Sequence, residues 1–170
     1  GYALRMLGRV RMDRGNFGGA EEAFQAALKL VPEDSRLWTE IARYHFVSAD
    51  HRKAIEASDK AVAFDPKDIR ALEFRGQMVR SQYGLAAALP WFEGALAIRP
   101  DDIPLLEEYA ATLGELGRNR EMLATARKIL SINSRNGRAY YMQAVIAARA
   151  GDYPLAQRIL LLAGSAINEM

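Results

Sequence analysis

Apolar and small side chains recur along the chain at helical spacing, and the pattern stops at regular intervals. Leu4, Leu7 and Gly8 lie at positions i, i+3 and i+4 of a first run, which Gly15 and Asn16 then interrupt. A second run follows at the same spacing and ends before a proline: Ala20, Phe24, Ala27 and Leu28, then Pro32. Residues 4–32 therefore predict a helix, a turn, a second helix and a stop.

The same pattern returns when 34 is added to each position. It fills the chain with five units, residues 1–34, 35–68, 69–102, 103–136 and 137–170. At the three positions of each unit where paired helices must approach closely, 13 of 15 residues are Ala or Gly, whereas chance would give about four. We predict one all-α domain, 1–170, and we expect it to be a segment of a longer protein because the chain begins and ends with repeat sequence.

Turn and capping residues support these boundaries. Gly15 suits a turn with positive φ, and Asn16 can cap the second helix. Pro90 falls about five residues inside a predicted helix, so we expect that helix to start late or to bend. The four junctions carry good N-cap residues at one repeat position: Asp34, Asp68, Asp102 and Asn136.

Composition excludes several classes of function. Lys plus Arg number 23 and Asp plus Glu number 21, so net charge gives no support to nucleic-acid binding. With no cysteine, the chain has no disulfide and no thiolate nucleophile. No apolar run approaches the ~18 residues of a membrane span. We therefore expect no membrane insertion, while the cellular compartment stays open.

The repeat resembles the tetratricopeptide repeat, which has 34 residues, small residues in both helices, a Gly-Asn/Asp-aromatic turn and a closing proline. The first unit matches at nearly every one of these positions, from Leu4 to Pro32. The resemblance implies a right-handed superhelix of five antiparallel helix pairs, whose first helices line a concave groove for a partner peptide. It also implies a scaffold or adaptor rather than a catalyst.

In this family, positions 2, 5, 9, 12 and 13 of each 34-residue unit line the groove, and in the first three units six of these fifteen residues are arginine. We predict that they hold an acidic peptide through charge-assisted bonds, with apolar side chains beside them; the alternative is that these arginines are solvated or pair with neighbouring acids. Glu73 stands where a family variant that grips chaperone C-termini has a basic residue, which argues against that ligand. The predicted peptide-binding residues are Arg5, Arg9, Met12, Arg36, Arg43, Phe46, Arg70, Gln77 and Arg80.

Catalysis has little support in the sequence. His45 and His51 lack metal-ligand spacing to each other or to a cysteine, and Glu107 and Glu108 are adjacent on a helix and face different ways. We expect no enzyme activity, no metal and no cofactor. Single-stranded RNA binding is a weaker alternative, because it needs a basic face along every unit and the fourth unit is acidic.

Self-association is the second candidate function. Leu160, Leu161 and Leu162 lie in the last predicted helix, where no further unit follows to cover them. Ends of repeat arrays need polar caps. We therefore expect that the chain either continues past Met170 or buries this end against another molecule, as in a homodimer.

Overall fold

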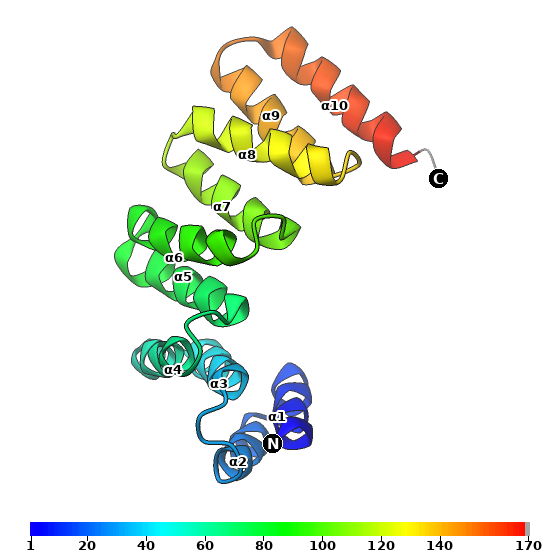
Figure 1. The fold of residues 1–170 in the computed structure, drawn as a ribbon. Coiled ribbons are helices and arrows are strands. Elements are labelled where there is room, and N and C mark those ends of the chain that lie inside the picture. The colour runs from blue at the N-terminus through cyan, green and yellow to red at the C-terminus, as the bar shows by residue number, and fades with distance from the viewer. Residues whose placement is uncertain (169–170) are drawn as a thin grey trace. The chain divides into compact units, whose positions relative to one another are not determined.

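The computed structural model describes residues 1–168, and these residues form ten α-helices and no strand (Figure 1). This confirms the all-α prediction. The helices are α1 (Tyr2–Asp13), α2 (Phe17–Leu28), α3 (Ser35–Val47), α4 (His51–Phe64), α5 (Ile69–Tyr83), α6 (Leu85–Ile98), α7 (Ile103–Glu115), α8 (Asn119–Ile132), α9 (Gly137–Arg149) and α10 (Tyr153–Asn168).

The helices belong to two compact units, Gly1–Gln82 and Tyr83–Met170, which we call unit 1 and unit 2. In unit 1, α1 packs on α2, and α3 packs on α4 and contacts α1 and α2. In unit 2, α6 packs on α7, α7 on α8, α8 on α9, and α9 on α10. The boundary falls inside the third repeat, at the last residue of α5, so a single rigid domain and a right-handed superhelix stay predictions.

The predicted turn and capping residues have their expected conformations. Gly15 has φ of 75°, and the side chain of Asn16 accepts a hydrogen bond of 2.9 Å from the amide of Gly19. The four junction residues each accept at least one backbone N–H of the next helix: Asp34 from Arg36 and Leu37, Asp68 from Arg70, Asp102 from Leu105, and Asn136 from Ala139. The ends of these hairpins are therefore encoded locally, as the sequence indicated.

Small residues let the paired helices approach, as predicted. Ala20 and Ala27 of α2 are fully buried. A Cβ atom added at Gly8 of α1 would lie only 2.5 Å from Cε1 of Phe24, whose ring is part of the core of unit 1. The aromatic ring thus occupies the space that a side chain at Gly8 would need.

Two local irregularities are absorbed without interrupting the helices. The helix α6 begins at Leu85 and continues through Pro90, so the late start that we expected is not seen. In the fourth repeat Met122 replaces a small residue of α8, and Gly114 of α7 leaves room for it, because a Cβ atom there would lie 2.6 Å from the sulfur. A glycine on the facing helix therefore compensates for the larger residue.

Candidate functional site

Arg5 and Arg9 of α1 and Arg43 of α3 lie on helices of unit 1 that contact each other, and one carboxylate lies near two of these arginines. Oε1 of Glu40 on α3 lies 3.8 Å from Nη1 of Arg9, and Oε2 of the same carboxylate lies 3.9 Å from Nε of Arg43. Its side chain is only 14% exposed. Arg5 lies one helical turn before Arg9, and its guanidinium lies 5.4 Å from the ring centroid of Tyr2. We call Arg5, Arg9, Glu40 and Arg43 the arginine surface.

Aromatic rings form the neighbouring part of unit 1. The guanidinium carbon of Arg43 lies 5.2 Å from the centroid of the Phe74 ring, a cation–π distance. Phe46 meets the same ring edge to face, with centroids 6.5 Å apart. Phe46 is half-buried and Phe74 is buried. The ring of Phe74 on α5 therefore supports Arg43, and Phe46 on α3 stays partly accessible.

The other predicted arginines differ from one another in exposure and in ion pairing. Arg36 is exposed at the start of α3, while Arg70 pairs with Glu73 at 2.9 Å, so its charge is balanced within α5. Gln77 and Arg80 are half-buried further along α5. The alternative reading, in which groove arginines pair with neighbouring acids, therefore describes Arg70 well.

Met12 is a core residue. It is 6% exposed and belongs to the hydrophobic core of unit 1. The reason is helical geometry, because Met12 follows Gly8 by four residues and therefore shares its inward stripe. We remove Met12 from the candidate surface.

The three leucines of the self-association hypothesis are on the surface of unit 2. Leu160, Leu161 and Leu162 of α10 are 47%, 75% and 59% exposed. Consecutive residues of a helix point about 100° apart, so these three leucines cover a wide face of α10. Ala156 and Ala163 point instead toward the interior and are buried.

A pocket that the sequence did not reveal lies in unit 2 between α7 and α9, with α8 behind it. Its volume is about 440 Å³. Most of its lining residues stand at groove positions of the fourth and fifth repeats. The 34-residue period identifies these positions in the sequence, but it does not show that their side chains enclose a space. The lining residues are Ala111, Gly114, Glu115, Met122, Gly137, Arg138, Tyr141, Met142, Val145 and Arg149.

Titratable side chains are not clustered as a metal site in the part of the chain that the structure describes. No group of three or more His, Asp or Glu residues with metal-binding geometry occurs there. Burial lowers the pKa of His45, with the charge of Lys53 as a second cause, and His51 is exposed. The carboxylate of Glu107 accepts bonds of 2.7 Å from Asn136 and Arg138, which indicates a structural role.

These features define an all-helical repeat protein whose surface residues vary from one hairpin to the next. The sequence model of the tetratricopeptide repeat matches residues 5–69 and 40–103, which together span more than half of the chain. The chain belongs to the tetratricopeptide-repeat family. Proteins of this family bind protein or peptide partners and are generally not enzymes. Within residues 1–168, no helix has the length and apolar character required to cross a lipid bilayer.

Individual proteins extend this comparison. A 121-residue stretch is 30% identical to the protein O-mannosyl-transferase TMTC1 of Mus musculus, covering 67% of this chain and only 12% of that protein. A crystal structure of MamA superposes with a TM-score of 0.80 at 19% identity, over 94% of each chain. YrrB, described as a tetratricopeptide-repeat protein with an unusual peptide-binding site, superposes with a TM-score of 0.74 at 15% identity, over 95% of this chain and 84% of its own. The two structures support the fold alone.

Proposed function

We propose that this chain is a non-catalytic peptide-binding module and that the arginine surface of unit 1 binds an acidic segment of a partner protein. The observation that carries the proposal is the balance of charge around Glu40, where one carboxylate lies near the guanidinium groups of both Arg9 and Arg43, and Arg5 adds a further positive charge one helical turn from Arg9. A partner carboxylate would supply the negative charge that this surface lacks.

The geometry of Glu40 supports this. Charge-assisted N–H···O bonds are about 2.7–2.9 Å long, whereas Glu40 lies 3.8 and 3.9 Å from the nitrogens of Arg9 and Arg43. These are electrostatic contacts that leave the N–H groups of both arginines available. An incoming carboxylate can therefore form hydrogen bonds with Arg9 and Arg43 without displacing Glu40. The half-buried Phe46 offers an apolar contact beside them.

Fluorescence anisotropy with a short labelled peptide of alternating Glu and Ser tests the proposal, with a Lys and Ser peptide as the opposite-charge comparison. The test variant carries Arg5→Gln, Arg9→Gln and Arg43→Gln. Because an exposed ion pair contributes roughly 0.5 kcal/mol, we expect the three changes to weaken binding about tenfold. Salt should weaken binding to the unmodified chain for the same reason.

The matched control carries Arg14→Gln, Lys29→Gln and Arg52→Gln, which remove the same charge at exposed positions outside the arginine surface. Circular dichroism shows whether both variants are folded. Equal weakening of both would mean that only net charge attracts the peptide. In that case, or if the Lys peptide bound as tightly, the arginine surface is not the site.

The exposure of three consecutive leucines on α10 favours a second candidate function, self-association of the chain through unit 2. Light scattering across a concentration series measures it, and Leu161→Glu places a charge on the most exposed of the three. A dimer that is lost in this variant supports association through α10. A monomer at all concentrations rules it out for this chain.

A further inference from the structure

The pocket in unit 2 has an apolar floor. Met122 of α8 and Met142 of α9 are buried, and Val145 is half-buried beside them. The volume of about 440 Å³ lies in the range of ligand pockets, which starts near 300 Å³. It is large enough for one or two bulky side chains. Methionine side chains adapt to different apolar shapes because they are unbranched and flexible.

The pocket depends on small residues of α7. Gly114 lines it, and its missing side chain leaves room for Met122, while Ala111 lines the wall one turn earlier. At the rim, Tyr141 of α9 is 63% exposed, although its ring is large and apolar. An exposed aromatic ring above an apolar cavity is suited to cover an inserted side chain.

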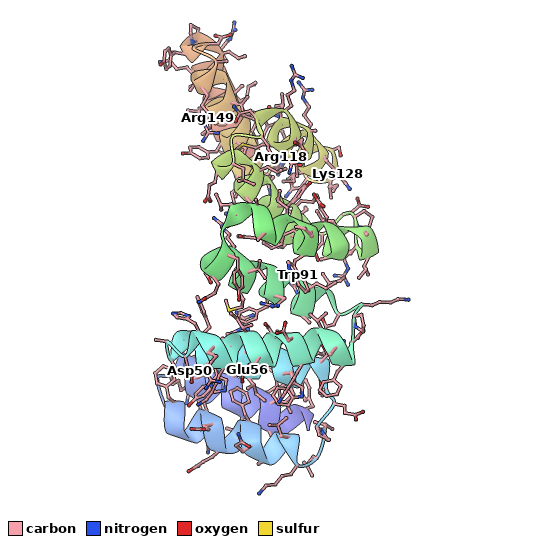
Figure 2. The ribbon with its side chains drawn as sticks, turned by 90° about the vertical axis from the view of Figure 1, so that its left-hand side faces the viewer. Asp50, Glu56, Trp91, Arg118, Lys128 and Arg149 are labelled. Atoms are coloured by element: carbon pink, nitrogen blue, oxygen red, sulfur yellow. The ribbon has the colours of Figure 1, made fainter. Side chains whose placement is uncertain are left out.

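The charged groups at the rim are held in different ways. Arg138 forms an ion pair of 2.7 Å with Glu107, so its charge is balanced. Arg149 donates from Nη1 to the carbonyl oxygen of Gly114 and to Oδ1 of Asn119, both at 2.9 Å (its side chain is labelled in Figure 2). Both acceptors are neutral, so they orient the guanidinium without neutralising its charge. Glu115 also lines the pocket and carries the opposite charge.

We propose that this pocket binds a bulky apolar side chain of a partner peptide, with an adjacent carboxylate of that peptide bound by Arg149. The apolar side chain rests on Met122, Met142 and Val145, below Tyr141. The carboxylate accepts from Nε and Nη2 of Arg149, since Nη1 is already bonded. The site lies within unit 2 and does not depend on the arginine surface of unit 1.

Methyl-labelled methionine gives a direct readout, because Met122 and Met142 line the pocket whereas Met12 and Met78 lie in the core of unit 1. The full chain is titrated with three acetylated, amidated tetrapeptides, Ser-Phe-Asp-Ser, Ser-Ala-Asp-Ser and Ser-Phe-Asn-Ser. We expect the Phe-Asp peptide to shift the two pocket methyl signals and to leave the signals of Met12 and Met78 unchanged. Because burying a Phe side chain contributes about 1.5–3 kcal/mol, the Ala-Asp peptide should bind at least about tenfold more weakly.

Two variants separate the parts of the proposal. Arg149→Gln should reduce binding of the Phe-Asp peptide to the level of the Phe-Asn peptide and leave the latter unchanged. Ala111→Leu fills the pocket and should abolish the shifts, whereas Ala124→Leu, at an exposed position of α8 outside the lining, should not.

The proposal is overturned if the pocket methyl signals do not respond to the Phe-Asp peptide, or if they respond equally to Phe-Asp and Ala-Asp. Equal binding of Phe-Asp and Phe-Asn to the unmodified chain overturns the role of Arg149. Neither result depends on Arg5, Arg9 or Arg43, so failure here is distinguishable from failure of the acidic-peptide site in unit 1.

Discussion

Replacing Gly8 with alanine tests the close approach of α1 and α2. The new methyl group would lie 2.5, 2.7 and 2.9 Å from three ring atoms of Phe24. That ring is 2% exposed and packed in the core, so it has little room to move. Overpacking of a core typically costs about 1–3 kcal/mol. Replacing Gly with Ala inside a helix stabilises the folded state by about 1 kcal/mol, because Ala has the higher helix propensity. The net expectation is a loss of roughly 1 kcal/mol.

Urea denaturation followed by circular dichroism measures this change, and Gly94→Ala is the matched control. Gly94 lies inside α6, and a Cβ atom there would meet no other atom within 4 Å. Only the propensity term acts at that position, so Gly94→Ala should stabilise the chain by about 0.5–1 kcal/mol. If both substitutions stabilise the protein equally, the ring of Phe24 does not occupy the space at Gly8 and the reasoning is refuted.

A double variant identifies Phe24 as the cause. In the first 34-residue repeat these two positions hold Gly8 and Phe24. In the fifth repeat the equivalent positions hold Ala144 and Leu160. In a Phe24→Leu background the Gly8→Ala change should therefore cost less than it does alone. Non-additivity of this kind is expected only for residues in contact. Strict additivity would show that the strain arises elsewhere.

Three further predictions rest on single side chains. Burial, and then the charge of Lys53, lower the pKa of His45, so the folded chain binds a proton on this imidazole less readily than the unfolded chain does. The neutral imidazole therefore contributes stability above pH 6.5, and this stability is lost as the pH falls below that value. The loss between about pH 7 and about pH 5 should be smaller in His45→Gln, measured by thermal unfolding. Asn136→Asp keeps the N-cap but sets a carboxylate against Glu107, so we expect a loss of about 1–2 kcal/mol in urea, which Glu107→Gln should recover. Asn16→Ala removes a cap and should cost about 1 kcal/mol in the same assay, whereas an unchanged midpoint would show that the cap contributes nothing.

The fold could be predicted from the sequence because its information is local and repeated. The turn at Gly15, the cap at Asn16 and the small residues opposite Phe24 each depend on contacts within one hairpin, and the 34-residue period repeats them. Met12 shows the limit of this reasoning. Periodicity places it near the groove positions, but its separation of four residues from Gly8 places it on the core stripe, where it is buried.

The candidate sites depend on distances between helices, which the sequence does not contain. No spacing rule shows that the carboxylate of Glu40 lies between Arg9 and Arg43 without hydrogen-bond contact. In the same way, the sequence placed Tyr141 and Arg149 among the groove positions but gave no sign of a pocket between α7 and α9. Both properties arise only once the helices are packed.

The fifth position of each repeat shows how a uniform fold leaves separate places for binding. The residues there are Arg5, Thr39, Glu73, Glu107 and Tyr141, whereas the eighth position holds only Gly or Ala. Three of the five have polar partners that position them, because Thr39 bonds to a carbonyl oxygen of its own helix, Glu73 pairs with Arg70, and Glu107 binds Asn136 and Arg138. The two others carry the large side chains of the proposed sites, Arg5 in unit 1 and the exposed Tyr141 in unit 2. Arg5 contacts the ring of its neighbour Tyr2 on the same helix, and Tyr141 is 63% exposed, so substitutions at these two positions should alter binding far more than folding.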